Sequence, residues 1–254
     1  MKAPVSWLRD FAALPADASV SSVARAIADA GFEVASIDGD VIDFEITANR
    51  PDCLSIRGLA REAATAMGVQ GPRVQGPGSE VLQGSGSEGP GSRVQVAIES
   101  PLCGRFALAM ADVTVGPSPQ WLAERLTACG VRPINNIVDI TNYVMLECGQ
   151  PMHAYDAAKV RGGRLVARLA TAGERLTTLD DVERTLDASM LVIADAEGAV
   201  GVAGVMGGAA SEVSANTTTI ALEAAWFQPA AVRAASKKLG LKTEASTRFE
   251  RGAD

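Results

Sequence analysis

A stretch rich in glycine, proline and serine interrupts the chain and limits what it can fold into. Residues 71–92 read GPRVQGPGSEVLQGSGSEGPGS and hold almost no apolar side chains. Such a segment buries too little surface to offset the entropy that is lost when it becomes ordered. We therefore interpret 71–93 as a linker between two domains, one formed by 1–70 and a larger one formed by 94–254.

Composition and charge narrow the class of protein. The chain is 47% hydrophobic and 21% charged, as is usual for globular proteins, and no apolar run approaches the length that spans a bilayer. The net charge of -7 argues against a broad nucleic-acid-binding face, because phosphate contacts need clustered lysine and arginine. Local basic residues are where any RNA contact is expected, although a solvated helix face explains them equally well. They are Arg233, Lys237, Lys238, Lys242, Arg248 and Arg251.

The four cysteines do not predict a metal site. No C-x-x-C pair occurs, and a single histidine cannot complete a Cys/His zinc set. We expect no metal, no membrane contact and four reduced thiols in a cytoplasmic protein that lacks a signal peptide. Cys129 and Cys148 each come at the end of an apolar helical pattern, which predicts that both pack in the core.

The N-terminal part carries two helical patterns and one alternating pattern. Apolar residues recur at helical spacing over 21–31 and again over 55–67, which predicts two amphipathic helices. Ile42 and Phe44 alternate with acidic residues within 41–47, which predicts a half-buried strand. Together these elements predict a small helix-rich domain.

The larger part begins with a strand pattern and two predicted helices. Ser118 is placed to cap the first helix, with Pro119 at its first helical position and Gly130 after its last turn. The second helix is predicted over 136–148 and is ended by Gly149. Its expected apolar face consists of Ile137, Ile140, Val144 and Cys148.

Short strands dominate the remainder. A turn at 178–181 predicts a hairpin, and a basic helix is predicted over 229–239 before Gly240. Helices and strands follow one another without a regular βαβ rhythm, which favours an α+β fold over a doubly wound sheet. The strands of this part are predicted over 94–98, 106–115, 165–169, 190–193, 200–205 and 218–224.

His153 is the first candidate site residue. It is the only imidazole and follows the helix stop at Gly149, so we expect it on a loop. A loop histidine can transfer protons or orient a substrate. Its ring can also simply be satisfied by a backbone carbonyl, and the residue alone favours that simpler interpretation.

The glycine-rich run at 201–208, GVAGVMGG, is the second candidate. Its spacing does not match G-x-G-x-x-G and no Gly-Lys-Ser/Thr follows, so neither a dinucleotide site nor a phosphate loop is predicted. Such glycines indicate close approach of the backbone to a ligand or to a neighbouring strand. The residues alone leave both open.

Glu223 is the third candidate, because it interrupts the apolar strand pattern of 220–226. A carboxylate among small apolar side chains needs a partner or a polar ligand. A glutamate on the solvent face of an edge strand explains the pattern equally well. Together with His153 and the glycines, Glu223 indicates a small pocket but does not identify a reaction.

Several longer motifs resemble the β subunit of bacterial-type phenylalanyl-tRNA synthetase. The VSWL at 5–8 and the TANRPD at 47–52 agree with that family, and the resemblance covers essentially the whole chain except the linker. The motifs that carry most of it are RPINNIVDITNYVMLE at 132–147, QPMHAYD at 150–156, AGVMGG at 203–208 and LKTEASTRFERG at 241–252.

The resemblance implies a fold and an activity. It implies that 1–70 is similar to the small N-terminal (B1-like) module of this subunit. It implies that 94–254 is similar to the B3/B4 editing module, a layered α+β fold that recurs in a tRNA-lysidine synthetase. In the family this module hydrolyses tyrosyl-tRNA(Phe), the product of mistaken tyrosine activation. We therefore expect part of an aminoacyl-tRNA ligase that alone could act only as an ester hydrolase.

The resemblance also implies roles for the matching residues. His153, Thr141 and Asn142 are similar to residues that act in hydrolysis, with His153 orienting water or ribose. Glu223 is similar to the residue that accepts the tyrosine hydroxyl. The residues similar to those that line the pocket are Gly204, Gly207, Thr243 and Ala245.

The implied partners and cofactors belong to a larger assembly. The resemblance implies the tRNA(Phe) 3′ end carrying tyrosine as substrate, with the remainder of the β subunit and the α subunit of an (αβ)2 assembly as partners. That parent uses ATP and Mg to attach phenylalanine, whereas we expect no cofactor for this chain itself.

Two departures from the family pattern bear on function. The family usually carries an oligonucleotide-binding barrel near 37–41, where only Asp38-Gly39-Asp40 stands, and the sequence ends at Asp254 within a family motif. We therefore expect a fragment of the subunit. The alternative to an editing function is a non-catalytic structural or tRNA-docking fragment with a vestigial pocket.

Overall fold

The computed structural model describes residues 1–71 and 94–253. The predicted linker, apart from Gly71, lies outside the described residues, and so does Asp254. The division into 1–70, 71–93 and 94–254 stays a prediction. Within the described residues, no helix is both long and apolar enough to cross a membrane.

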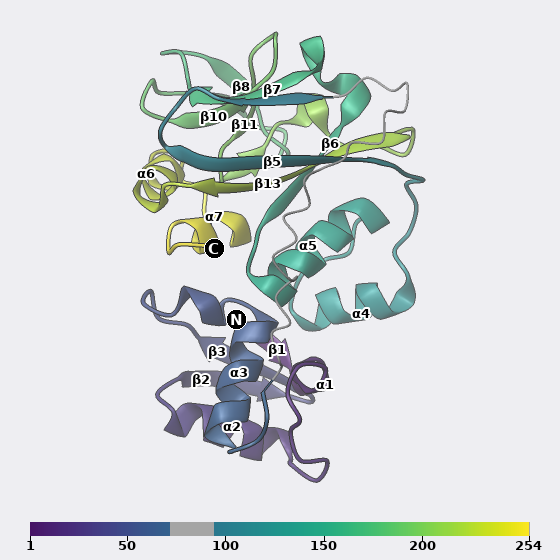
Figure 1. The fold of residues 1–254 in the computed structure, drawn as a ribbon, viewed down its shortest axis with the longest axis vertical. Coiled ribbons are helices and arrows are strands. Elements are labelled where there is room, and N and C mark those ends of the chain that lie inside the picture. The colour runs from purple at the N-terminus through teal and green to yellow at the C-terminus, as the bar shows by residue number, and fades with distance from the viewer. Residues whose placement is uncertain (72–93, 254) are drawn as a thin grey trace.

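A small antiparallel sheet and three helices form the N-terminal part, which lies at the lower end of Figure 1. The predicted helices at 21–31 and 55–67 and the predicted strand at 41–47 are confirmed. The strands in spatial order are β1 (Lys2–Pro4), β3 (Val41–Glu45) and β2 (Glu33–Asp38), and the helices are α1 (Val5–Arg9), α2 (Val20–Asp29) and α3 (Ile56–Ala66).

The description of this part as helix-rich is incomplete, because β1 and β2 were not predicted. All but one residue of β2 are exposed, so no apolar alternation marks it in the sequence. It pairs with β3 through a tight hairpin in which Gly39 adopts φ +56°. The side chains of Ile42 and Phe44 on β3 are buried against the helices, as their alternation predicts.

Two sheets dominate the larger part, and the predicted α+β class is confirmed. In Figure 1 the strands of the larger sheet lie above β5 and β13, and α7 lies below them. The five-stranded sheet has the order β12 (Met206–Gly207), β11 (Ala199–Val202), β10 (Leu191–Ala194), β7 (Arg164–Leu169) and β4 (Gln95–Ile98). The three-stranded sheet has the order β5 (Cys103–Asp112), β13 (Thr219–Phe227) and β6 (Met152–Asp156). The hairpin predicted at 178–181 joins β8 (Arg175–Thr177) to β9 (Glu183–Thr185).

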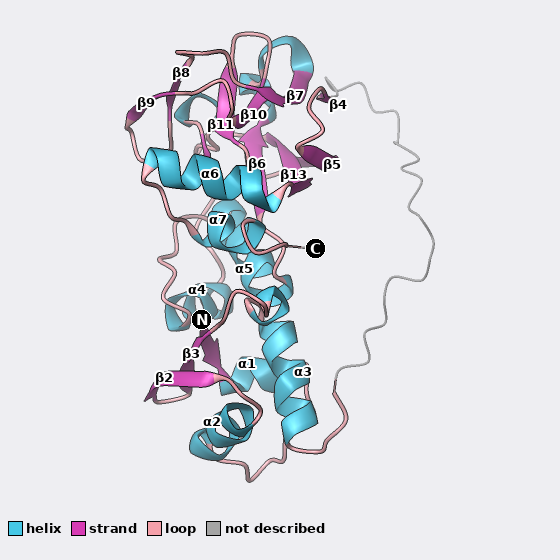
Figure 2. Cartoon of the chain, turned by 90° about the vertical axis from the view of Figure 1, so that its left-hand side faces the viewer, coloured by secondary structure: helices cyan, strands magenta, loops and turns pink. Residues whose placement is uncertain are grey.

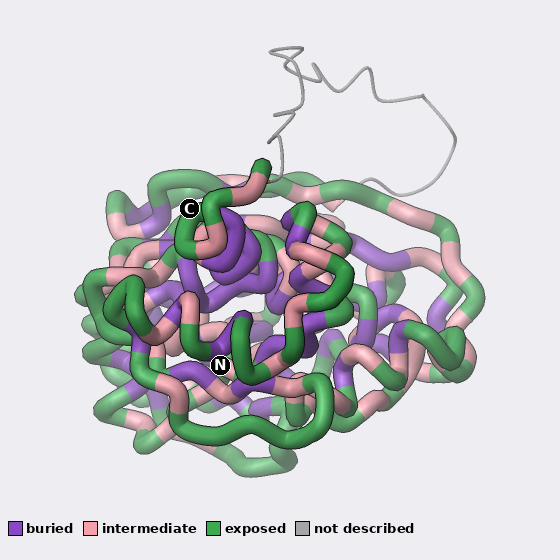
Figure 3. The backbone as a smooth tube through the Cα atoms, turned by 90° about the horizontal axis from the view of Figure 1, so that it is seen from below, coloured by how far each residue is buried: buried purple, intermediate pink, exposed green. Residues whose placement is uncertain are grey.

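The helices α6 (Pro229–Leu239) and α7 (Glu244–Phe249) lie close to one another, as Figure 2 shows from the side. A single hydrophobic cluster joins both sheets to these helices, with Leu165, Val192 and Phe227 among its buried members. Figure 3 shows buried segments, in purple, running through the interior of the molecule. The predicted helix 229–239 is confirmed, and Gly240 ends it at φ +63°.

Two further helices, α4 (Gln120–Ala128) and α5 (Asn136–Cys148), connect the larger part to the N-terminal part. Leu122, Leu126 and Leu146 belong to the same buried cluster as the N-terminal residues. The ring of Trp7 stacks on that of Tyr143 with centroids 4.7 Å apart. The core of the N-terminal part is therefore completed by residues that follow the linker in sequence.

The predicted apolar face of α5 is wrong in part, since Ile137 is buried but two of its other members are exposed, although the bounds 136–148 are confirmed. Ile140 is 49% exposed and Cys148 is exposed, whereas Thr141 and Met145 are buried. The reason is that α5 is covered on more than one side, so a single stripe does not describe its contacts. The expected core role of Cys148 is wrong for the same reason, whereas the half-buried Cys129 packs against the N-terminal cluster.

Ser118 does not cap α4 as predicted. Its hydroxyl donates instead to Asp139 Oδ2 at 2.5 Å, and the residue that precedes α4 is Pro119. Asp139 is fully buried and also accepts from the Ile134 N–H at 2.8 Å. A buried carboxylate needs donors, and this need outweighs the weaker local preference of a serine for a cap.

Candidate functional site

All eight residues that the resemblance assigns to a site line one cavity of about 270 Å³. The cavity is bounded by α5, β6, the β11–β12 turn, β13 and the start of α7. Gly201 and Met145 also line it, as do Tyr155 and Glu244, which the sequence did not single out. The predicted residues brought together here are Thr141, Asn142, His153, Gly204, Gly207, Glu223, Thr243 and Ala245.

Strand pairing places the polar side chains on one side of the three-stranded sheet. Glu223 on β13 lies directly opposite His153 on β6, and Ala221 lies opposite Tyr155. Residues paired across strands, and residues two apart on one strand, project from the same face. His153, Tyr155 and Glu223 therefore face the cavity together.

The expectation that His153 lies on a loop is wrong, because it lies within β6. The glycine at Gly149 does end α5, with φ +85°, but the chain enters the sheet almost at once. The decisive partner is β13, which lies far along the chain and leaves no local mark on the sequence around His153.

The imidazole of His153 is neutral at physiological pH. Burial lowers the pKa of His153 to about 4, since the charged form loses its hydration. Its Nε2 atom is buried and has no hydrogen-bond partner among the described residues. A buried polar atom of this kind is costly, and a ligand or water that enters the cavity can supply the missing partner.

The carboxyl of Glu223 is buried on the central strand of its sheet, with 7% of its surface exposed. This excludes the solvent-facing edge-strand alternative. Burial raises the pKa of Glu223 to about 7, while a hydrogen bond from Tyr155 acts in the opposite direction. The phenol of Tyr155 donates to Glu223 Oε2. Burial raises the pKa of Tyr155 well above its ordinary value, and the nearby Glu223 charge adds to this.

Tyr155 was not among the site residues predicted from the sequence. Its ring meets that of His153 edge-on, with centroids 4.5 Å apart and an interplanar angle of 85°. Had His153 been assigned to a strand, spacing by two residues would have placed Tyr155 on the same face.

The glycines of the run are required by close packing inside the site. A Cβ at Gly207 would lie 2.4 Å from His153 Cε1, and one at Gly204, which adopts φ +70°, would lie 3.0 Å from Phe249 Cδ2. Gly201 pairs with Gly207 across β11 and β12. The sequence left open whether these glycines approach a ligand or a neighbouring strand. In the structure the run packs against a neighbouring strand and also lines the cavity.

The start of α7 is tied to the turn that follows β11. Thr243 Oγ1 donates to the Val205 carbonyl at 2.9 Å and accepts from the Ser246 N–H at 3.0 Å. Ala245, two residues further on, also lines the cavity. On α5, the Thr141 hydroxyl donates to the Val138 carbonyl at 2.7 Å, while the Asn142 amide makes no hydrogen bond to any described residue. Asn142 is therefore free to contact a ligand.

Arg248 is not available for RNA, contrary to the expectation from its place in the basic set. It is 1% exposed, and its Nε donates to the Leu54 carbonyl at 3.1 Å. Arg251 donates to the Ile46 carbonyl at 2.9 Å. Both residues fasten the C-terminal end to the N-terminal part. Of the six basic residues predicted for RNA contact, the four whose side chains are exposed are Arg233, Lys237, Lys238 and Lys242.

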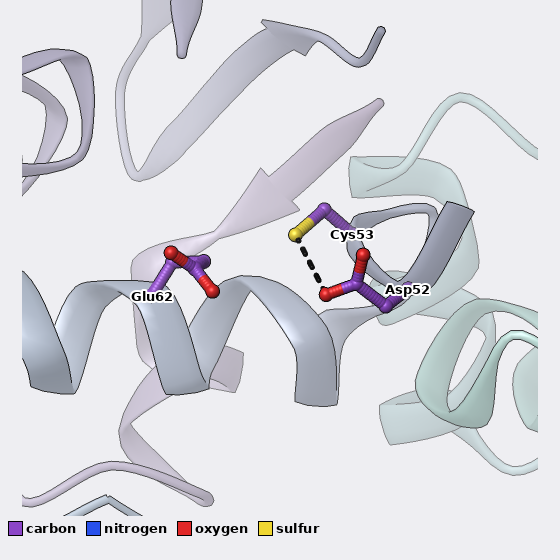
Figure 4. Close-up of side chains that lie close together, drawn as sticks. All are labelled: Asp52, Cys53 and Glu62. Carbon is purple, nitrogen blue, oxygen red and sulfur yellow. Dashed lines mark hydrogen bonds between the residues drawn. The ribbon is translucent and has the colours of Figure 1, made fainter. Parts of the chain in front are cut away.

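Asp52, Cys53 and Glu62 form a second cluster of potential ligands, which Figure 4 shows between the turn before α3 and α3 itself. The guanidinium of Arg50 already binds all three, with its Nη2 at 2.9 Å from Asp52 Oδ2, 3.1 Å from Cys53 Sγ and 2.7 Å from Glu62 Oε1. Burial raises the pKa of Cys53 to about 12, which disfavours the thiolate that metals bind. The cluster is an ion-paired cross-link of the N-terminal part.

Comparison with known proteins identifies the family. Residues 102–254 match the family model described as the B3/4 domain. The chain belongs to the B3/4 domain family. The match includes every residue that lines the cavity.

Curated proteins that are similar to this chain are named as phenylalanine–tRNA ligase β subunits. A phenylalanine–tRNA ligase β subunit of Carboxydothermus hydrogenoformans is 47% identical over 87% of this chain, and one of Moorella thermoacetica is 49% identical over 94%. The chain spans 27% and 28% of the length of these two relatives. The predicted resemblance to phenylalanyl-tRNA synthetase β subunits is confirmed.

A solved structure is a more distant likeness. It is an N-terminal fragment of the phenylalanyl-tRNA synthetase β-subunit from Pyrococcus horikoshii, 14% identical, with a TM-score of 0.44 over 98% of this chain and 73% of that chain.

Proposed function

We propose that the cavity binds the tyrosyl group of tyrosyl-tRNA(Phe) and hydrolyses its ester bond. The observation that carries this proposal is a buried carboxyl, Glu223, which faces a cavity of about 270 Å³. That volume is close to the lower end of small-molecule pockets, ~300 Å³, and suits one amino-acid side chain better than a nucleotide. The open cavity also favours editing over the docking alternative, which predicts a pocket filled by side chains.

Selectivity follows from hydrogen bonding to the phenol. Tyrosine differs from phenylalanine by one hydroxyl, which can donate to the Glu223 carboxylate. A phenylalanyl group would bury that carboxylate with no donor besides the Tyr155 phenol, and an unpaired buried acceptor atom costs about 1–3 kcal/mol, more when charged. Sites built to bind a hydroxyl reject analogues that lack it for this reason.

Hydrolysis needs a positioned water and polar groups near the ester. The neutral His153 can accept or donate a hydrogen bond through its unpaired Nε2, so it suits the orientation of water or of a ribose hydroxyl. Because its pKa is depressed, it does not serve as a protonated general acid near neutral pH. Asn142 and Thr141 of α5 also line the cavity and can hold the ester, and the terminal adenosine can contribute its own hydroxyl.

The wider setting is part of the same proposal. The names of the relatives describe ligase subunits, so we infer that the chain acts with the remainder of a β subunit and with an α subunit, in the cytoplasm. ATP and Mg would serve the ligase reaction of that parent. No lysine or arginine lines the described cavity, so its residues do not fit a nucleotide triphosphate, and no step here depends on one.

The test compares deacylation of tyrosyl-tRNA(Phe) and phenylalanyl-tRNA(Phe) by the chain. We expect the tyrosyl ester to be hydrolysed in preference, and Glu223→Ala to lose that preference while Glu183→Ala, at an exposed position, keeps it. Equal hydrolysis of both esters, or of neither, contradicts editing; the latter result supports the docking alternative. Soaking with L-tyrosine should place its hydroxyl beside Glu223.

A further inference from the structure

The phenol of Tyr155 forms a hydrogen bond with one oxygen of the Glu223 carboxyl, which faces the cavity. It donates to Glu223 Oε2, and both side chains are buried. No other described residue donates a hydrogen bond to this carboxyl. The second oxygen, Oε1, is therefore the one left for a ligand.

The sheet and the core fix this arrangement. Because Glu223 pairs with His153, and Ala221 with Tyr155, the phenol approaches the carboxyl diagonally across β6 and β13. The Tyr155 ring lies within the main hydrophobic cluster and against the edge of the His153 ring. A ring held in this way can present its hydroxyl in only one direction.

We propose that Tyr155 is the positioning residue that sets the hydroxyl selectivity of the site, by holding Glu223 with one oxygen committed and the other free to accept from a ligand phenol. This inference rests on the proposed function, since it assigns the selectivity of the same cavity. The carboxyl then accepts one hydrogen bond from the Tyr155 phenol and a second from the phenol of a tyrosyl group. A phenylalanyl group supplies no second donor.

The same hydrogen bond counteracts the effect of burial on the charge of Glu223. Burial raises the pKa of Glu223, and the Tyr155 phenol lowers it again, so loss of the phenol should leave more of the carboxyl protonated near neutral pH. The other titratable groups toward it are His153 of β6, the Cys103 thiol of β5 and Glu244 at the mouth of the cavity. Burial lowers the pKa of His153 to about 4 and raises that of Cys103 to about 11, so neither changes charge in this range.

Tyr155→Phe in the full chain tests the proposal, because it removes the hydroxyl and keeps the ring. The readout is the ratio of kcat/KM for tyrosyl-tRNA(Phe) to that for phenylalanyl-tRNA(Phe), measured across pH. Taking the ratio removes the pH dependence that is common to the hydrolysis of both esters. The wild-type ratio should rise as Glu223 ionises, with a midpoint near its pKa of about 7.

The expected result is a selectivity about tenfold lower in the variant near neutral pH, with the midpoint moved to higher pH. Tyr143→Phe is the matched control, because Tyr143 is the only other tyrosine and its hydroxyl accepts from Arg125 Nη1 at 3.1 Å, outside the cavity. It should change neither the ratio nor the midpoint. A purely structural role for Tyr155 would lower both rates alike.

The outcomes separate the two proposals. A wild-type chain that does not distinguish the esters overturns the proposed function, whereas a folded Tyr155→Phe with unchanged ratio and midpoint overturns only the role of Tyr155. If Tyr155→Phe does not fold, 3-fluorotyrosine incorporated at both tyrosines provides the second test. Its more acidic phenol is a stronger donor and should move the midpoint to lower pH, and an unmoved midpoint overturns the inference.

Discussion

Arg248 and Glu223 are both buried ionisable residues, yet their surroundings differ. The guanidinium of Arg248 joins α7 to the N-terminal part and donates to the Leu54 carbonyl and to both the carbonyl and the carboxylate of Glu244. In the cavity, Glu223 receives one hydrogen bond from Tyr155, and the Nε2 of His153 has no partner among the described residues.

The difference separates a structural contact from the proposed binding site. Buried polar groups whose hydrogen bonds are complete hold the fold together, whereas incompletely paired ones cost stability and are retained where a ligand completes them. Mutation of Arg248, which joins α7 to the N-terminal part, should therefore mainly lower the stability of the fold. The cavity should respond through selectivity and through pH.

The largest expected effect is the loss of stability in Arg248→Ala. This change removes every hydrogen bond of the guanidinium, leaves the buried Leu54 carbonyl without that donor and opens a cavity, so we expect the free energy of unfolding to fall by about 3 kcal/mol. Urea denaturation followed by circular dichroism measures it. Arg25→Ala, in an exposed pair with Asp29, should change stability by less than about 0.5 kcal/mol. A loss as small at Arg248 would contradict its structural role.

A smaller effect of the opposite sign is expected for Glu223→Gln. Glu223 has a folded-state pKa of about 7 against an ordinary value of 4.5, so the wild type is most stable below the lower value and loses stability as pH rises between them. Glutamine carries no charge, so the variant should become more stable relative to the wild type across this range, by on the order of 2 kcal/mol at about pH 6. Urea denaturation of both proteins across pH measures the difference. A difference that does not vary with pH, as expected for the exposed Glu183→Gln, would show that Glu223 is not held against its ionisation.

The smallest expected effect is that of Gly207→Ala on activity. The added Cβ would lie 2.4 Å from His153 Cε1, so the imidazole must move. We expect deacylation of tyrosyl-tRNA(Phe) to slow by about tenfold, equivalent to about 1.4 kcal/mol. Gly116→Ala is the control, because a Cβ there meets no atom within 4 Å. Equal rates in the two variants would show that the position of the His153 ring does not affect the reaction.

Local patterns predicted most of the secondary structure. Periodicity gave α5 and α6 with the same bounds as the structure, and Gly149 and Gly240 end these helices in the left-handed conformation. The same patterns failed where contacts come from several sides. The buried face of α5 includes Thr141, which no apolar stripe marks, and β2 is exposed along most of its length.

Motif resemblance named eight residues that share one cavity, but it gave them no geometry. It did not reveal that Tyr155 engages Glu223 or that His153 lies in a strand. It also offered Arg248 as a basic surface residue, because charge is visible in a sequence whereas burial is not. These errors share one cause, since each concerns contacts between segments that are distant in sequence.

The sequence by itself determined the α+β class and the positions of most helices and strands, because backbone propensity and amphipathic spacing are local properties. Its motif resemblance also named eight residues that line one cavity. Only the tertiary structure decided which of these residues are charged, neutral or unpaired. Pairing of β6 with β13 brings Glu223, His153 and Tyr155 together, and their protonation depends on that burial and on partners far along the chain.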